Sequence, residues 1–378
     1  MRRKIMVVLA LLALVTNAVA DITVSDIEAF SGYPWNEVAI GYTISGADGT
    51  LLVVEANDLE TGRRYLASNT EMSKSISGAE LTVGRHILKW DMAADGIRIK
   101  SNKVAFSVKV WERKPKYCVV NLMDYSVEYI DEIPSGGWTD KYKTTKLVLK
   151  LIGPGQFKMQ NEYDVTLTKP FYMGVFEVTL KQWRMVRWSE SWLTYEDGDM
   201  RPMDEAWYVD VRGRSVGTGW PSSDKVDADS FLGKLRERTG LNFDLPTEAQ
   251  WEYACRAGTT TTYSYGDSVN GDYMWFWGNT EGLEGWTIVH NPRAVGTRLP
   301  NPWGLYDMHG NAREWCLDWF GDLDVATDPK GANSGSARVV RGGGSGSYPP
   351  EEDCSSSSRS GDHQISKNGF RLALTLRN

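Results

Sequence analysis

The sequence predicts two domains, a small all-β domain followed by a larger, loop-rich domain. Residues 21–112 alternate apolar and polar side chains in short runs separated by Gly, Asn and Asp, with no helical period between them. From Trp138 onward the chain holds 13 of its 16 tryptophans and many glycines, which is typical of long loops fixed by aromatic rings. Once an N-terminal leader is removed, about 358 residues remain, more than one hydrophobic core usually supports.

The first twenty residues have the composition of a secretory signal peptide. Three basic residues precede a short apolar run, and Ala18-Val19-Ala20 offers a cleavage site before Asp21. The run is too short for a membrane span, so we expect secretion or export to the periplasm. The remaining chain has 39 basic and 49 acidic residues, a formal charge of −10. We therefore expect no nucleic-acid partner, and no later segment is predicted to span a membrane.

Residues 21–112 are predicted to form a β-sandwich of the immunoglobulin-like kind. Period-two alternation is typical of antiparallel strands with one buried face, and several such strands in a row favour two packed sheets. The clearest strand-like runs are residues 37–46, 50–67, 84–96 and 103–111.

Residues 113–140, which begin with a polar stretch punctuated by proline, are predicted to connect the two domains. After this segment, residues 227–240 predict a helix, because aspartates precede it and Gly240 follows it. Its apolar side would consist of Phe231, Leu232 and Leu235.

A second helix is predicted within residues 245–258. Thr247 and Gln250 have the spacing of a capping box, and Gly258 is a typical helix stop. Cys255 lies one turn after a tryptophan on the same face, so we interpret it as a packed residue rather than a nucleophile.

Six motifs in the second domain occur in a fixed order. They read GPGQFKM, KPFYMGVFEVTLKQW, LPTEAQWEYACRAGT, NPWGLYDMHGNAREWCLDWF, RVVRGG and NGFRLAL. Together they resemble the formylglycine-generating enzyme family, also called sulfatase-modifying factor domains, over residues 141–378. The resemblance implies a C-type-lectin-like α+β fold for this domain, following the N-terminal all-β immunoglobulin-like sandwich.

The resemblance also implies an activity, copper-dependent oxidation of a cysteine in a sulfatase Cys-x-Pro-x-Arg segment to formylglycine. Two thiolates close together hold the soft Cu(I) ion in that reaction. The loop after Arg341 can be aligned with the family's two thiol positions in two ways. One alignment places Ser347 and Glu352 there and the other Tyr348 and Asp353, so neither supplies a thiol. Cys354 would add at most one thiolate, and we interpret it as structural, either free or bridged to Cys255 or Cys316. The sequence therefore disfavours Cu(I), and we assign no catalytic residue.

A calcium site is implied by the motif YDMHGNAREW. The family's ligands match Asp307 and Glu314 through their side chains, and Gly310 and Ala312 through their carbonyls. Oxygen ligands from a tight loop suit Ca²⁺, so we expect one structural calcium ion. A second family site matches less well, with Asn279 and Thr280 at its first positions and Thr287 where an acidic ligand would stand.

The long loop after the glycine run is the expected ligand-binding surface, although a solvated loop without a ligand remains the alternative. Its candidate residues are Arg341, Ser345, Ser347, Tyr348, Glu351, Arg359 and His363. We expect a calcium-stabilised protein that binds a protein, peptide or glycan. The alternatives are an active oxidoreductase, through formylglycine formation or another metal, and a structural cell-surface module. Isolated histidines count against a three-histidine iron site.

Overall fold

The computed structural model describes residues 22–30, 37–46, 51–60, 64–68, 76–77, 82–92, 99, 103–111, 115–187, 198–284, 287–323 and 325–375. The predicted signal peptide lies outside these ranges. The chain folds as two compact units, Met1–Pro115 with Arg238–Asn242 and Leu376–Asn378, and Lys116–Glu237 with Phe243–Thr375. In the described ranges, no helix combines the length and apolar character that crossing a bilayer requires.

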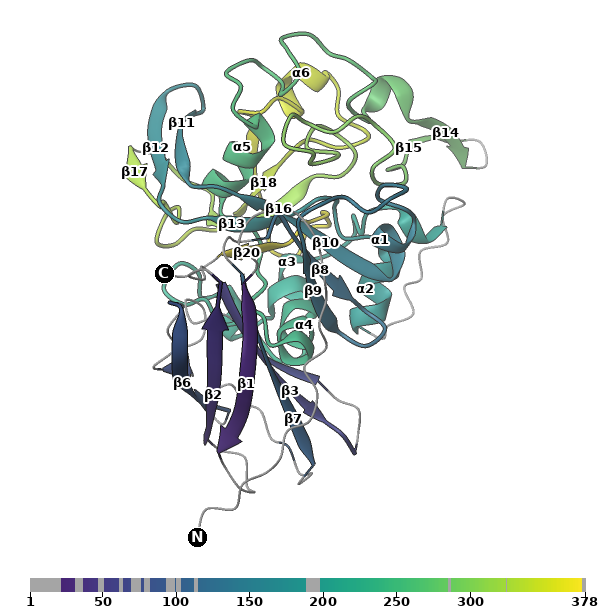
Figure 1. Cartoon of the computed structure of the whole chain (residues 1–378). Helices are drawn as coiled ribbons and strands as arrows, with labels where there is room; N and C mark the ends of the chain where they lie inside the picture. The colour runs from purple at the N-terminus through teal and green to yellow at the C-terminus, as the bar shows by residue number, and fades with distance from the viewer. Residues whose placement is uncertain are drawn as a thin grey trace. The chain divides into compact units, whose positions relative to one another are not determined.

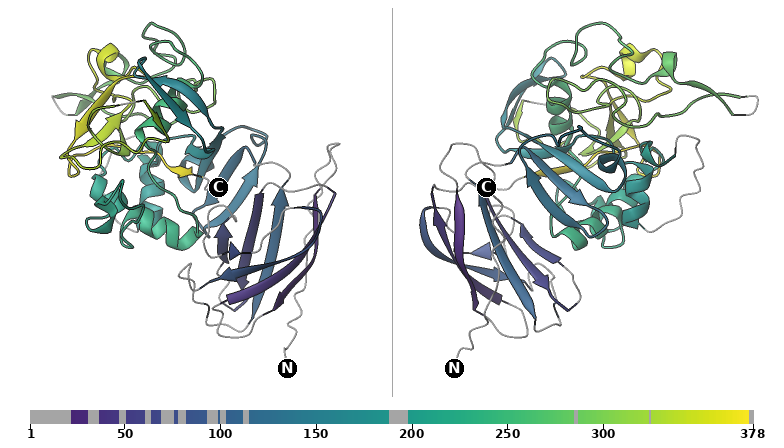
Figure 2. Two further views of the ribbon diagram at one scale, coloured as in Figure 1. Left: turned by 90° about the vertical axis from the view of Figure 1, so that its left-hand side faces the viewer. Right: turned by 45° about the vertical axis from the view of Figure 1, so that its right-hand side comes forward.

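The strands of the first unit form two antiparallel sheets. One has the strand order β1-β2-β6-β5 and the other the order β4-β3-β7, and they lie in two layers in the views of Figure 2. The strands are β1 (Thr23–Phe30), β2 (Glu37–Ser45), β3 (Leu51–Asp58), β4 (Arg64–Ser68), β5 (Ile76–Ser77), β6 (Gly84–Asp91) and β7 (Val104–Trp111).

Both sheets contribute to one hydrophobic core. In β2 every second side chain is buried, namely Val38, Ile40, Tyr42 and Ile44, which confirms the alternation expected for residues 37–46. They share their cluster with Leu52, Val54 and Ala56 of β3 and with Phe106 and Val108 of β7. The two sheets therefore pack face to face, whereas the immunoglobulin-like assignment stays a prediction.

The second unit is built on a five-stranded antiparallel sheet in the order β20-β13-β10-β8-β9 (Figure 1). At one edge of this sheet β20 pairs with β13, although the two strands are far apart in the sequence. The bounds are β8 (Tyr117–Asn121), β9 (Ser126–Ile130), β10 (Lys146–Ile152), β13 (Phe171–Gly174) and β20 (Ala373–Thr375).

Three smaller sheets carry the loops of this unit. Their strand orders are β11-β12-β17, β14-β15 and β16-β18-β19. The bounds are β11 (Gly155–Met159), β12 (Tyr163–Leu167), β14 (Glu281–Glu284), β15 (Thr287–His290), β16 (Glu314–Trp319), β17 (Ala326–Thr327), β18 (Arg338–Arg341) and β19 (Arg359–Asp362).

Short helices lie between these strands. The α-helices are α1 (Lys141–Thr144), α2 (Leu180–Arg187), α3 (Tyr208–Arg212), α4 (Phe231–Thr239), α5 (Glu248–Arg256) and α6 (Pro350–Asp353). Single 3₁₀ turns are η1 (Gly198–Met200), η2 (Val216–Thr218) and η3 (Trp277–Asn279). Both predicted helices, α4 and α5, are confirmed.

Helix α5 has the predicted capping box. Thr247 accepts a hydrogen bond from the Gln250 backbone N–H, and the Gln250 side chain accepts one from the Thr247 backbone. The helix ends one residue earlier than predicted, because Ala257 already has the left-handed conformation, with Gly258 following it at positive φ. The helix packs against β11, β16 and β18 (Figure 1), which places it under the loops that carry the predicted site residues.

Candidate functional site

The predicted calcium loop lies over a cluster of buried carboxylates. Asp307 has a left-handed backbone with φ of 56°, and its Oδ2 accepts a 2.6 Å hydrogen bond from the Gly296 backbone. Its Oδ1 is buried and has no hydrogen-bond partner in the described part of the chain. Glu314, the first residue of β16, is also fully buried; Arg371 donates to its Oε1 at 2.6 Å, and Trp251 to its Oε2 at 2.8 Å.

Glu177, just after β13, is a third buried carboxylate in this cluster. It accepts hydrogen bonds from the Ala312 backbone at 2.9 Å and from the Asn311 side chain at 2.7 Å. Burial, together with the charges of Asp307 and Glu314, raises its pKa well above the ordinary range. We did not predict a role for Glu177, although a single carboxylate inside the apolar run MGVFEVTL is a recognisable sign of a buried, paired charge.

Part of this arrangement fits a cation. Burial raises the pKa of Asp307 to about 6, and its unpartnered Oδ1 is the kind of buried oxygen that a hard cation would satisfy. Glu314 fits less well, because both of its oxygens are already engaged by Arg371 and Trp251. In the ranges that the structure covers, no group of three or more His, Cys, Asp or Glu is arranged to hold a metal ion. Calcium at this loop stays a prediction.

Asn279 and Thr280, the residues expected at the second calcium site, form hydrogen bonds with neighbouring segments instead. Asn279 caps η3, since its Oδ1 accepts from the Phe276 backbone and its Nδ2 donates to the Met274 carbonyl. Thr280 is buried, and its Oγ1 lies 2.6 Å from the Ser345 carbonyl. The Thr287 side chain lies outside the described residues.

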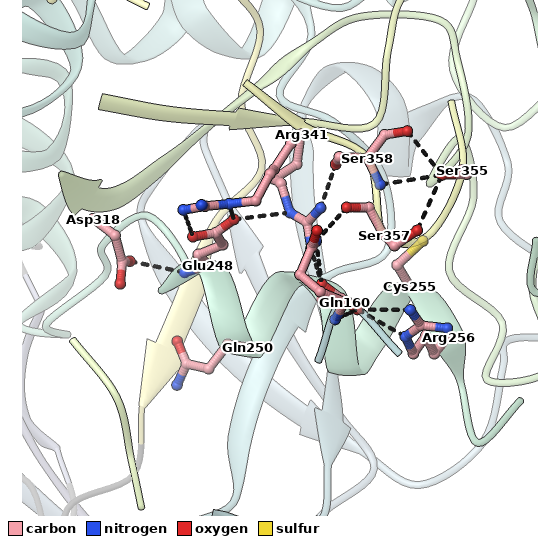
Figure 3. A network of polar contacts seen from close by, with 12 residues as sticks. Gln160, Glu248, Gln250, Cys255, Arg256, Asp318, Arg341, Ser355, Ser357 and Ser358 are labelled. Atoms are coloured by element: carbon pink, nitrogen blue, oxygen red, sulfur yellow. Dashed lines mark hydrogen bonds and ion pairs between the residues drawn. The ribbon is translucent and has the colours of Figure 1, made fainter. Parts of the chain in front are cut away.

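A second polar network joins helix α5 to both ends of the loop formed by residues 342–358 (Figure 3). At the start of this loop, Arg341 donates to Glu252 and lies 3.5 Å from a Glu248 oxygen. At its far end, Arg359 forms two hydrogen bonds with Glu248, at 2.6 and 2.8 Å. The Glu248 backbone N–H in turn donates to Asp318, whose pKa burial raises to about 7. One helix thus holds the loop at both ends.

This network corrects the prediction for two of the expected ligand-binding residues, Arg341 and Arg359. Arg341 was expected on the binding surface, but its guanidinium is buried against Glu252 and the Trp251 ring. Arg359 is likewise occupied by Glu248, so both arginines position the loop and neither is free to contact a ligand. The exposed members of the predicted set are Tyr348, Glu351 and His363.

The cysteines are free and buried. Cys118, Cys255, Cys316 and Cys354 form no disulfide, so the bridged alternative for Cys354 is not observed. Burial raises the pKa of the Cys354 thiol to about 12. Its carbonyl accepts a 2.8 Å hydrogen bond from His309 Nδ1, while Nε2 of the same ring accepts from the Ser264 backbone, which fixes the tautomer. Cys354 is therefore a packing residue of the loop.

Next to the loop lies a cleft of about 270 Å³. Ser345 and Ser347 of the loop form one wall, and Asp204, Lys367 and Asn368 contribute polar groups from other segments. None of the described lining residues is a histidine or a cysteine. We did not predict a site role for Asp204, Lys367 or Asn368. Asp204 and Lys367 come from segments without a legible motif, and Asn368 begins the motif NGFRLAL, to which we assigned no site. The cleft offers hydrogen-bonding groups rather than a nucleophile with its base.

Comparison with known proteins identifies the second unit. The family described as "Sulfatase-modifying factor enzyme 1-like domain" matches residues 139–376, more than half of the chain. The chain belongs to the sulfatase-modifying factor family. This confirms the resemblance drawn from the six sequence motifs.

Several known proteins match parts of the chain. The chaperone protein LppX of Paenibacillus barcinonensis is 30% identical over 227 residues, covering 52% of this chain and 78% of that protein. The formylglycine-generating enzyme of Streptomyces coelicolor is 35% identical over 161 residues, 36% of this chain and 49% of the enzyme. The match thus spans about half the length of the Streptomyces enzyme.

Among solved structures, Treponema denticola variable protein 1 aligns with a TM-score of 0.47 at 22% identity, covering 61% of this chain and 95% of that one. PvdO from Pseudomonas aeruginosa aligns with a TM-score of 0.45 at 21% identity, covering 61% and 94%.

The positions that we expected to match the family's cysteine pair, in one alignment of the loop or the other, carry oxygen-bearing side chains. Ser347 is buried, and its Oγ accepts from the Gly344 backbone at 2.9 Å. Asp353 forms a 2.9 Å ion pair with Arg313, and Tyr348 and Glu352 are exposed. These four positions offer hydroxyl and carboxylate oxygens, which are poor ligands for Cu(I).

Proposed function

We propose that the chain is an exported recognition protein of the sulfatase-modifying factor family, stabilised by calcium, that binds a protein, peptide or glycan and performs no copper-dependent oxidation. The observation that carries this proposal is that the positions expected to match the family's two thiols hold serine, tyrosine or carboxylate residues in either alignment of the loop. A buried Cys354 with a raised thiol pKa does not supply the missing thiolates.

The location of the ligand follows from the cleft beside the 342–358 loop. Its wall is held in place by the buried ion pairs of Arg341 and Arg359 with helix α5, so its polar groups are preorganised. Loops on a rigid scaffold are common sites of recognition. One relative also bears the name of a chaperone, which denotes a binding protein rather than an oxidase.

The calcium part of the proposal rests on Asp307, whose buried Oδ1 has no partner in the described chain. Bound Ca²⁺ would take this oxygen and neutralise part of the charge shared by Asp307, Glu177 and Glu314. A ligand that binds only the folded state raises the melting temperature. We expect Ca²⁺ to raise it relative to a chelator for the natural chain but not for Asp307→Ala.

The decisive test is an oxidation assay on the full chain. The purified protein receives copper, a reductant, dioxygen and a peptide with the Cys-x-Pro-x-Arg segment, beside a competent family enzyme as the positive control. Mass spectrometry then measures the aldehyde product. We expect no conversion by this chain. Conversion would overturn the proposal and would mean that another set of residues holds the metal.

A further inference from the structure

Three aromatic rings lie together beside the cleft. The Trp277 ring of η3 lies 4.9 Å from the Tyr348 ring and 5.2 Å from the His290 ring, measured between centroids. Trp277 is 46% exposed and Tyr348 72% exposed, so these two rings meet solvent while His290 supports them. Large aromatic side chains with exposed faces usually serve binding, because solvent exposure of their surface is unfavourable.

The aromatic rings are attached directly to the wall of the cleft. Tyr348 follows Ser347, and Ser345 donates a 2.6 Å hydrogen bond to the His290 carbonyl. The same 342–358 loop therefore lines the cleft with Ser345 and Ser347, whose hydroxyl groups bond within the protein, and carries the aromatic side chain of Tyr348 directly after them. Because Trp277, Tyr348 and His290 pack on one another, little conformational entropy would be lost when a ligand binds.

The polar groups of the cleft favour a ligand with many hydroxyl groups. Lys367 is paired with Glu205 at 3.0 Å, and Arg313 with Asp353 at 2.9 Å, so these cations already have anionic partners. The Asp204 carboxylate forms no ion pair in the described chain, and the amide oxygen of Asn368 can still accept while its nitrogen donates to Asp362. The cleft is thus rich in acceptors. Burial raises the pKa of Asp204 to about 6 although the charges of Arg201 and Lys367 lie near it, and its ionised form offers no hydrogen-bond donor to an anionic ligand.

We propose, on the basis of the recognition role above, that the cleft and the rings of Trp277 and Tyr348 bind a neutral sugar ring of an oligosaccharide. The face of such a ring carries weakly positive C–H groups, which fit the negative face of an aromatic ring. Its hydroxyl groups donate to Asp204 and Asn368. The small volume suits one or a few sugar units better than a folded protein, which needs about 800 Å² of contact on each partner.

The test is calorimetric titration of the full chain with four neutral hexasaccharides, namely cellohexaose, mannohexaose, xylohexaose and chitohexaose. We expect at least one to bind, and Trp277→Ala and Tyr348→Ala to weaken that binding about tenfold, as loss of a stacked ring implies. Trp277→Phe keeps a ring and should retain most of the affinity. Phe320→Ala is the matched control, because Phe320 is another exposed ring (41%) that stacks on Arg359 instead.

Absence of binding by all four sugars at about 1 mM would overturn the sugar assignment. Binding that is equal in all variants, or weakened as much by Phe320→Ala, would overturn it too. The Cys-x-Pro-x-Arg peptide is titrated in parallel. If that peptide binds without being oxidised and no sugar binds, the recognition role stands and only the sugar assignment fails, whereas peptide oxidation overturns the recognition role itself.

Discussion

Replacing Arg341 by methionine should destabilise the second unit strongly. The guanidinium donates to Glu252 and to the Ser358 carbonyl, lies near Glu248 and faces the Trp251 ring. Methionine has a similar length and apolar stem, so Arg341→Met removes the charge with little change of volume. Two buried carboxylates would then lose one of their cations.

The loss in the free energy of unfolding depends on the partners that Glu248 and Glu252 keep when Arg341 is replaced. Removal of one partner from a buried ion pair costs about 3–5 kcal/mol. Glu252 keeps Arg256 at 2.7 Å and the Gln160 backbone N–H at 2.8 Å, and Glu248 keeps Arg359, so the low end applies. We expect a free energy of unfolding about 3 kcal/mol lower, which for a domain of this size corresponds to a melting temperature about 6–12 °C lower.

Tryptophan fluorescence during urea or thermal unfolding measures this effect, because 13 of the 16 tryptophans lie from Trp138 onward. Arg313→Met is the matched control. Its ion pair with Asp353 has a similar length, 2.9 Å, but both side chains are more than a third exposed, so the loss should stay below about 1 kcal/mol. If Arg341→Met is no less stable than Arg313→Met, the buried network does not hold the loop as described.

Three further predictions concern a tight turn, a titrating carboxyl and the thiols. Gly310→Ala should lower the free energy of unfolding by about 3 kcal/mol, because Gly310 has a φ of 79° and an added Cβ would overlap the Trp275 carbonyl. Gly258→Ala is the control in the same unfolding assay. Gly258 has a similar φ of 88° but open space around it, so the loss should be only about 1 kcal/mol. The pKa of Asp318 is raised to about 7, so its contribution to stability is fully present below the ordinary aspartate pKa of about 4 and is lost as the pH rises from there to about 7. Between pH 5 and pH 8 the natural chain should therefore lose about 2–3 kcal/mol relative to Asp318→Asn. Parallel pH profiles for the two proteins would contradict this. Ellman's reagent should label none of the four buried cysteines in the folded chain. After denaturation without a reductant it should label all four, and a lower number would indicate a disulfide.

The sequence predicts the regular elements of this chain well because their signals are local. The Thr247–Gln250 capping box lies within one helical turn and identifies the start of α5. The alternation in residues 37–46 likewise follows from the strand itself, since every second side chain faces the core.

The candidate site is harder to predict because its contacts join distant segments. A run of three glycines after Arg341 suggests an exposed loop, yet Glu252, the partner of Arg341, lies 89 positions earlier in the chain. The cleft combines Asp204 with Lys367 and the serines of the loop, and no periodicity or spacing connects those positions. Only the fold shows which of the polar residues in the motifs are buried and which are accessible.

Clamping both ends of the 342–358 loop on helix α5 has a consequence for protein engineering. Arg341 and Arg359 both approach Glu248, so the ends of the loop stay together whatever lies between them. The entropy of closing a loop rises only slowly with its length. The exposed tip around Tyr348 can therefore serve as an exchangeable cassette, in which sequences are randomised to select new ligands while Ser356 and Cys354 keep the buried part in place.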